Sequence, residues 1–195
     1  MSATRPTAVL RLSTPRMELR TPCQGDAGEF AAYRVRNRQA HGWTEPPRQE
    51  EYFTAGYWHN ALAPVPDRAK NDTEYRFAAF LKDDPDHLVG LVNLYNVMRG
   101  PIQCALLGYS VDAGHMGRGL ASEAVSAVVS WAFGPADLMR LEANVLPENH
   151  ASIRVLEKCG FHRVGLMRKS LRLAGGWQDH YMYETVNEHH RGDRP

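Results

Sequence analysis

The chain has 195 residues, of which 43% are hydrophobic and 23% are charged, and its formal net charge is +1 with a pI of about 7.8. This length suits one well-buried core, so we expect a single domain over residues 1–195, with a core from about 10 to 186 and a frayed polar C-terminal tail. The charge balance excludes the strongly basic composition, with a pI above roughly 9, that marks a nucleic-acid-binding domain.

The N-terminal third predicts one strand and two helices. Residues 16–22 (RMELRTP) alternate in polarity and end at a proline, which is typical of a strand. Residues 25–40 and 50–62 place apolar side chains at helical spacing. The intervening residues 41–48 (HGWTEPPR) contain two prolines and predict a loop.

The middle of the chain changes from helical spacing to runs of β-forming residues. Residues 74–83, 87–97 and 102–112 are apolar and are separated by turn residues, so we expect three consecutive antiparallel strands. Residues 120–133 then predict a helix whose apolar face carries Leu120, Ala124, Val128 and Trp131.

The C-terminal third repeats the alternation of strand and helix. Residues 138–146 predict a strand, 147–161 a helix that stops at Gly160, and 163–184 a closing hairpin around the turn AGG. Helices interleaved with strands of one mixed sheet indicate the α+β class, with three α/β/α layers.

The cysteines, the N-terminus and the hydropathy indicate the cellular setting. Cys23, Cys104 and Cys159 are odd in number and form no CxxC pair, so neither a disulfide framework nor a zinc site is indicated. No run approaches the roughly 18 apolar residues of a membrane span, and no secretory signal core is present. We expect a cytoplasmic protein with reduced cysteines and no metal or membrane association.

A glycine-rich loop, GHMGRGLASEA at residues 114–124, joins the third middle strand to the following helix. A helix N-terminus presents free amide N–H groups and the positive end of its dipole, and it binds phosphate where the backbone can approach. Gly114, Gly117 and Gly119 remove the side chains that would block this approach. The alternative is a tight turn without a ligand.

Two known phosphate-binding loops do not fit this segment. A P-loop needs lysine and a hydroxyl residue after its last glycine, whereas Leu120 and Ala121 follow Gly119. A dinucleotide fingerprint needs a third glycine and a parallel unit, whereas Ser122 stands at that position after an antiparallel meander.

A third pattern matches. The predicted elements follow one another as a strand, a loop of the type Q/R-x-x-G-x-G/A, a helix, a second strand, and a helix that begins N-x-x-S and ends K-x-G-F. This order resembles that of the GNAT acetyltransferase family. The matching residues are Gly119, Leu120, Ala121, Asn149, Ser152, Lys158, Gly160 and Phe161, while Met116 replaces the usual glutamine or arginine. From about residue 10 to 184, the segments RLSTPRMELR, NVMRG, ALLGYSVD, GRGLASEA and GGWQDH are similar to the RimJ/RimL branch, and most to its ribosomal-protein alanine N-acetyltransferases.

The resemblance implies a fold and a cofactor site. We expect a mostly antiparallel sheet in which one parallel pair, residues 108–112 and 141–145, splays apart to admit acetyl-CoA, with direct transfer and no metal. Asn149 is implied to bind the pantetheine. The strand edge that receives the pantetheine is implied to be Tyr109, Ser110 and Val111, and the pyrophosphate loop to be Met116, Gly117, Arg118, Gly119, Leu120, Ala121 and Ser122.

Three side chains are candidates for the chemistry. The resemblance implies that Ser152 protonates the departing thiolate, although Ser152 and Asn149 can equally serve only to cap their helix. Tyr109 is a second candidate donor, or a packed strand aromatic. Glu45, an exposed carboxylate in the loop between the first two helices, is a candidate acceptor contact or base, or a solvated loop charge. His115 borders the glycine loop, and we expect a surface histidine.

The acceptor is a protein N-terminus in the first hypothesis, and alanine of a ribosomal protein is implied by the resemblance. With pKa values near 7.7–8.0 for an α-amine and 10.4 for lysine, about one tenth of the former and under about one thousandth of the latter is neutral at pH 7. A site without an evident strong base therefore suits an N-terminus. A small-molecule amine, or a non-catalytic module that retains CoA binding and docks on ribosomal proteins, remains open, as does monomer or homodimer.

Overall fold

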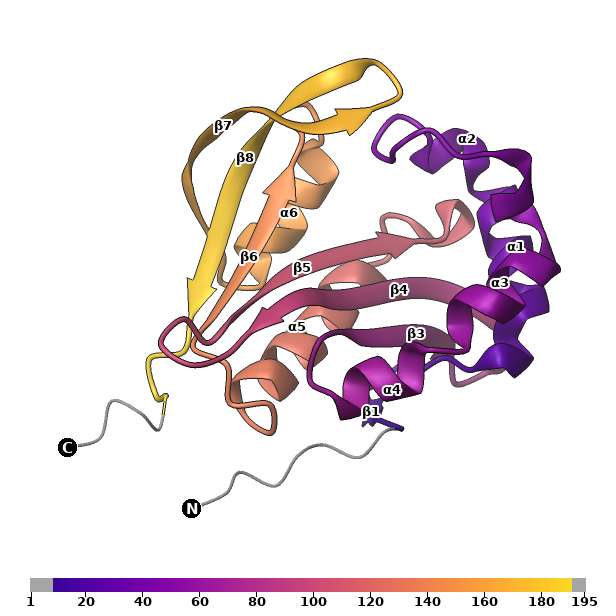
Figure 1. Cartoon of the computed structure of the whole chain (residues 1–195), viewed down its shortest axis with the longest axis horizontal. Coiled ribbons are helices and arrows are strands. Elements are labelled where there is room, and N and C mark those ends of the chain that lie inside the picture. The colour runs from indigo at the N-terminus through magenta and orange to yellow at the C-terminus, as the bar shows by residue number, and fades with distance from the viewer. Residues whose placement is uncertain (1–8, 191–195) are drawn as a thin grey trace.

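The computed structural model describes residues 9–190, which fold into one mixed sheet with helices on both faces (Figure 1). The strands are β1 (Arg11–Ser13), β2 (Met17–Arg20), β3 (Tyr75–Leu81), β4 (Asp84–Met98), β5 (Cys104–Val111), β6 (Arg140–Val145), β7 (His162–Leu173) and β8 (Gly176–Val186). The α-helices are α1 (Ala27–Arg36), α2 (Arg38–His41), α3 (Ala55–Leu62), α4 (Val65–Lys70), α5 (Leu120–Phe133) and α6 (His150–Lys158).

The strand order in the eight-stranded sheet is β1-β2-β3-β4-β5-β6-β8-β7. Neighbouring strands pair antiparallel except β5 and β6, which run parallel. Helices α1 and α3 pack with Ala78 and Phe80 on one face, whereas α5 packs with Phe77 and Ala79 on the other. The α+β class with three layers is confirmed.

Most predicted elements are present within a few residues of their expected bounds, but two helices are interrupted. The expected helix 25–40 divides at Asn37, whose side chain donates to the Tyr33 carbonyl at 2.8 Å and accepts the Ala113 amide at 2.7 Å. These bonds compete with the helical ladder. Residues 50–53 form a separate 3-10 turn before α3, and the short elements β1 and α4 were not expected.

Helix α5 is anchored beneath the sheet by the face that the sequence predicts. Leu120, Ala124, Val128 and Trp131 are all buried, and the Trp131 ring meets Tyr75 edge-on at 4.7 Å between centroids. This packing holds the N-terminus of α5 beside the end of β5. The glycine loop therefore lies at the edge of the sheet where β5 and β6 separate.

The parallel pair splays as expected. Its register runs from Cys104–Arg140 to Leu106–Glu142 and stops, although both strands continue. Beyond that point β5 stays paired with β4 as far as Gly90–Val111, while β6 stays paired with β8 as far as Val145–Tyr181. The two strands therefore diverge from each other (Figure 1).

The cysteines and the termini complete the description. All three cysteines are free: Cys104 is buried, Cys159 half-buried and Cys23 exposed. Within residues 9–190 no helix has both the length and the hydropathy needed to cross a membrane. The last residues of the expected polar tail, 191–195, lie outside the described part of the chain.

Candidate functional site

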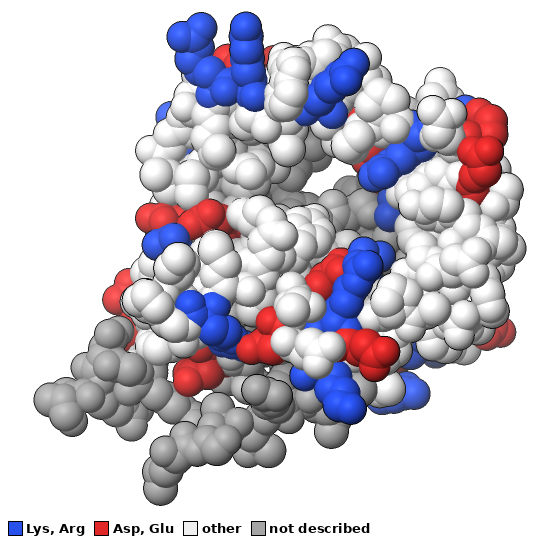
Figure 2. All heavy atoms as spheres, in the orientation of Figure 1, with Lys and Arg blue, Asp and Glu red and all other residues white. Residues whose placement is uncertain are grey.

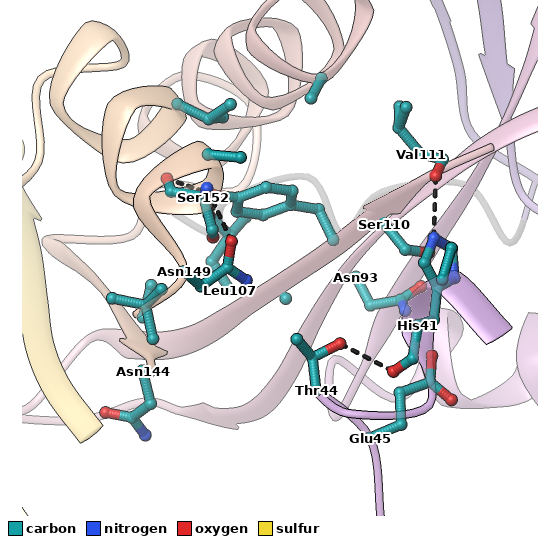
Figure 3. A pocket seen from close by; sticks show the side chains of 18 of the residues that line it. His41, Thr44, Glu45, Asn93, Leu107, Ser110, Val111, Asn144, Asn149 and Ser152 are labelled. Atoms are coloured by element: carbon teal, nitrogen blue, oxygen red, sulfur yellow. Dashed lines mark hydrogen bonds between the residues drawn. The ribbon is translucent and has the colours of Figure 1, made fainter. Parts of the chain in front are cut away.

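A cavity of about 1550 Å³ opens between the splayed strands and extends to the helices at the N-terminal side (Figure 3). Pockets for one small molecule usually have volumes of about 300–1,000 Å³, so this cavity has room for two reactants. The predicted site residues that line it are Glu45, Tyr109, Ser110, Val111, Met116, Gly117, Gly119, Leu120, Ala121, Ser122, Asn149 and Ser152. Arg118 is not among the lining residues, and Met116 is about half exposed.

The glycine loop holds a backbone shape that L side chains rarely adopt. Gly117 has φ +75° and Gly119, which precedes α5, has φ +78°. A Cβ atom at Gly117 would meet nothing within 4 Å, so the backbone is open on that side. No side chain caps the first turn of α5. Its amide N–H groups and helix dipole therefore offer an anion site at the cavity wall.

The β1–β2 turn braces this loop from outside. Glu123 accepts Thr14 Oγ1 at 2.7 Å and the Arg16 amide at 2.9 Å, and it forms a 2.7 Å ion pair with Arg16 Nε. Arg16 also donates to the Arg118 carbonyl at 2.8 Å. The contribution of Arg118 to the loop is thus through its backbone, because its side chain does not line the cavity.

One wall of the cavity carries a pair of hydroxyl groups. Tyr109 Oη lies 2.7 Å from Ser152 Oγ and donates to the Ser152 carbonyl at 2.9 Å. Burial raises the pKa of Tyr109, so the phenol keeps its proton at neutral pH. Asn149 Oδ1 accepts the Ser152 amide at 3.1 Å, which confirms the cap at the start of α6. Ser152 therefore combines a capped amide with a hydroxyl bound to Tyr109.

The opposite wall carries Glu45, and the expectation that it is exposed is wrong. Its side chain is only 25% exposed and forms a 2.8 Å ion pair with Arg34, which is 12% exposed. The loop folds against α1 because the Arg34 guanidinium, half enclosed by aromatic rings, needs a carboxylate partner. Among the described residues that line the cavity, Glu45 is the one carboxylate.

Sequence reasoning missed a close approach between β4 and β5. The Tyr95 hydroxyl lies 1.6 Å from where a Cβ atom of Gly108 would stand, so any side chain at that position would displace the Tyr95 ring. Tyr95 and Asn93 are both among the cavity-lining residues, and they stand two residues apart on β4. Burial raises the pKa of Tyr95 to about 12. The available signal was a glycine inside a strand pattern, which often marks such an approach.

His41 was also missed. Its Nε2 lies 2.9 Å from the Val111 carbonyl, and because a carbonyl only accepts, Nε2 carries the hydrogen. The Val111 oxygen, an expected pantetheine contact, is therefore already engaged. Burial lowers the pKa of His41, which keeps the ring neutral. Its Nδ1 is a buried acceptor without a partner in the described structure, as is Asn93 Oδ1 (Figure 3).

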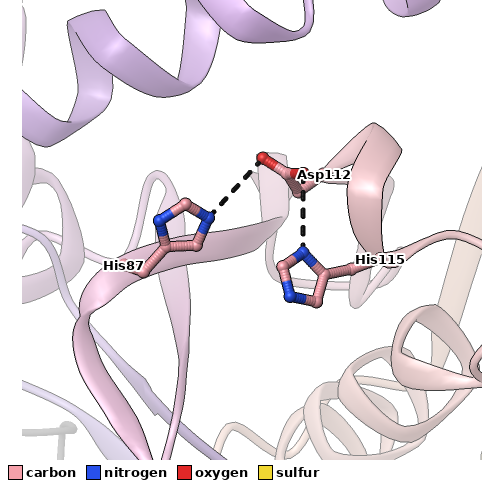
Figure 4. A group of neighbouring side chains, drawn as sticks. All are labelled: His87, Asp112 and His115. Carbon is pink, nitrogen blue, oxygen red and sulfur yellow. Dashed lines mark hydrogen bonds and ion pairs between the residues drawn. The ribbon is translucent and has the colours of Figure 1, made fainter.

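A second cluster, His87, Asp112 and His115, lies beside the glycine loop (Figure 4). His115 is 20% exposed in its side chain, more enclosed than the expected surface histidine, and its Nδ1 lies 3.5 Å from Asp112. Asp112 also accepts from Arg36, Asn37 and the Gly114 amide. Burial alone would raise the pKa of Asp112, but these donors lower it to about 2. Because a cation would face the Arg36 guanidinium, we assign the cluster a structural role.

The sequence profile of the acetyltransferase (GNAT) domain matches residues 16–162. The chain belongs to the GNAT acetyltransferase family. It is therefore an acyltransferase, and its co-substrate is acetyl-CoA. The uncapped start of α5, the open glycines and the splayed strands fit the pyrophosphate and the extended arm of this molecule.

Two relatives and one solved structure are similar to this chain over most of its length. The acetyltransferase is 38% identical over 162 residues, 83% of this chain and 89% of the relative, to the probable N-acetyltransferase YjcK of Bacillus subtilis. It is 30% identical over 173 residues, 89% of each chain, to the ribosomal protein uS5-alanine N-acetyltransferase of Escherichia coli. The structure of Mycobacterium smegmatis RimJ in complex with CoA-disulfide superposes with a TM-score of 0.84 at 27% identity, covering 92% of this chain and 87% of that one.

Proposed function

We propose that this acetyltransferase transfers the acetyl group directly to the α-amine of a protein N-terminus, an alanine of a ribosomal protein in the cytoplasm. The observation that carries the proposal is one cavity with the Tyr109–Ser152 hydroxyl pair on one wall and the carboxylate Glu45 on the other (Figure 3). The uS5-alanine acetyltransferase relative supports the choice of acceptor.

The acetyl-CoA site is proposed along the predicted residues. The pyrophosphate binds the backbone amides from Gly117 to Ser122, with Met116 at the rim. The pantetheine follows the β5 edge at Tyr109 and Ser110, and Asn149 binds it from the N-cap position of α6. Val111 is a weaker partner than expected, since its carbonyl accepts from His41.

The chemistry needs a balanced movement of one proton. The amine lone pair forms the N–C bond while the C–S bond breaks. The nitrogen gives up one proton to water, and the sulfur leaves with negative charge and then takes up one proton from water. When this charge forms, the Tyr109 hydroxyl turns from the Ser152 carbonyl to donate its hydrogen bond to the sulfur, and the Ser152 hydroxyl holds the phenol in place. Since burial raises the pKa of Tyr109, the phenol retains its proton and acts as an electrostatic donor.

Glu45 orients the acceptor. Arg34 fixes its carboxylate at the cavity wall, where it attracts an ammonium group before that group loses its proton. An α-amine is already about one tenth neutral at pH 7, so the site needs no strong base. A lysine side chain, with well under about a thousandth neutral, is a poor acceptor in the same place.

The test uses three synthetic peptides with acetyl-CoA and mass spectrometry of the products. We expect a peptide with a free N-terminal alanine to gain one acetyl group on that residue. The same peptide with a blocked N-terminus, and a blocked peptide with an internal lysine, stay unmodified. Acetylation of that lysine at a comparable rate would overturn the proposal in favour of a side-chain or small-molecule acceptor.

A further inference from the structure

The charges that line the cavity are unevenly divided. Arginine and lysine contribute six of its described lining residues, whereas Glu45 is the one acidic residue among them. Arg154 and Lys158 belong to α6, on the side proposed for acetyl-CoA. The other four lie on the side of Glu45 and Tyr95: Arg34, Arg48, Arg68 and Arg76.

These four arginines share two carboxylates. Arg34 and Arg48 lie 2.8 and 4.0 Å from Glu45. Arg68 and Arg76 lie 2.7 and 2.6 Å from Glu74, which does not line the cavity. We call the surface formed by these four arginines the acceptor wall. Its four positive charges are paired with two carboxylates, so two positive charges are not neutralised. A cleft with low-dielectric walls focuses the electric field of such charges onto a molecule that enters it.

Part of this charge lacks hydrogen-bond acceptors. The Arg34 Nε–H is buried and has no acceptor in the described structure. The Arg48 and Arg68 side chains are 38% and 45% exposed, which leaves their guanidinium groups open to an incoming ligand. A buried cationic donor without a partner is costly unless an anion arrives to satisfy it.

The β7–β8 hairpin adds positive charge on the other side of the opening. Leu171 and His180 of the hairpin line the cavity. The exposed residues Arg168, Lys169 and Arg172 lie on β7 with Leu171, and β7 has no acidic residue. Figure 2 shows basic side chains on both sides of the hollow between this hairpin and the N-terminal helices.

We infer that the acceptor is an acidic peptide: its N-terminal ammonium faces Glu45, and carboxylate side chains in the residues that follow contact the acceptor-wall arginines, above all Arg48 and Arg68. This inference rests on the proposed function and names the substrate class within it. A neutral peptide binds the same site more weakly, and a basic peptide is repelled.

The experiment compares three peptides that begin with alanine and differ only at positions two to four, which are glutamate, glutamine or lysine. We expect kcat/KM to be about fivefold or more higher for the glutamate than for the glutamine peptide, and lowest for the lysine peptide. The preference shrinks as salt is raised from about 0.05 to 0.5 M, because screening shortens the reach of exposed charges.

Two variants test whether the acceptor-wall arginines cause the preference for the glutamate peptide. Arg48→Glu and Arg68→Gln are expected to reduce the glutamate-to-glutamine ratio of kcat/KM several-fold, the charge reversal more strongly. Arg11→Gln removes an exposed arginine on β1 that does not line the cavity, and is expected to keep the wild-type ratio.

The outcomes separate this inference from the proposed function. Equal kcat/KM for the three peptides, or a ratio unchanged in both wall variants, overturns the inference while N-terminal acetylation stands. If none of the three peptides is acetylated but an anionic small-molecule amine such as an aminoacyl phosphate analogue is, both the peptide acceptor and the inference are wrong.

Discussion

The phenol oxygen of Tyr109 lies 2.7 Å from the hydroxyl oxygen of Ser152, although 43 residues separate them in the chain. The contact joins β5 to the first turn of α6 across the splayed strands. It places a protonated donor at the cavity wall, where the proposed thioester ends. Each residue can therefore be tested as a member of one pair.

Removal of the Tyr109 hydroxyl tests the donor. Tyr109→Phe is expected to lower kcat by about 100-fold, because a positioned donor contributes roughly that much, with acetyl-CoA affinity nearly intact. Ser152→Ala is expected to lower kcat less, and the double variant to lose little more than Tyr109→Phe alone. Steady-state kinetics and calorimetric titration measure both effects. An additive double variant would show that the hydroxyls act separately.

A substitution at a positive-φ glycine, with a matched control, tests whether the glycine loop binds acetyl-CoA. Gly117→Ala and Gly100→Ala both place a side chain at positive φ, +75° and +69°, in otherwise open space. Each is expected to destabilise the fold by about 1 kcal/mol. Only Gly117→Ala should weaken acetyl-CoA binding, by about tenfold, since Gly100 lies in the β4–β5 turn outside the cavity lining.

Gly119→Val is the stronger version of this test. It is expected to abolish acetyl-CoA binding. The added Cβ atom would meet only Arg16 Nη2, at 3.6 Å, but a β-branched residue at φ +78° is strained, so we expect a folded protein of lower stability. Calorimetry on protein with an unchanged circular dichroism spectrum is the measurement. Retained affinity in a folded variant would place the pyrophosphate elsewhere.

The close approach of Tyr95 to Gly108 predicts a change in acceptor binding. In Gly108→Ala the Tyr95 ring must move, because the new Cβ atom would otherwise lie 1.6 Å from the Tyr95 hydroxyl. We expect KM for the acceptor peptide to rise about tenfold or more, with KM for acetyl-CoA altered less. Gly165→Ala on β7, where nothing lies within 4 Å, is the control. Equal kinetics in both variants would remove Tyr95 from the acceptor site.

Asp112 predicts how stability depends on pH. Its pKa is about 2 in the fold, below the ordinary value of 3.8, because donors from Arg36, Asn37 and Gly114 outweigh burial. A depressed carboxyl pKa stabilises the fold above pH 4, and that stabilisation, about 2 kcal/mol, is lost as pH falls from about 4 to 2. Urea unfolding of Asp112→Asn should show a lower free energy of unfolding at pH 7 and a smaller loss on acidification. Asp83→Asn, an exposed turn residue, should follow the wild type.

The sequence by itself determined most of the elements and indicated the loop proposed to bind the cofactor. The apolar spacing of residues 120–133 predicts α5 with its bounds and its buried face, since one amphipathic period decides both. The glycines before Leu120 indicate an anion site because backbone freedom at a helix start is a local property. The order of strands and helices, with the matching motif residues, led to the family.

Only the tertiary structure decided the side of the cavity that we propose for the acceptor. In the sequence Glu45 can be a solvated loop charge, whereas α1 brings Arg34 to 2.8 Å from it. No sequence pattern links Tyr95 to Gly108, which become neighbours when β4 pairs with β5. The arginines of the acceptor wall come from α1, a loop, α4 and β3, so no sequence period joins them. Such groupings depend on contacts between distant segments, whose register is set by packing of the whole core and not by any local pattern.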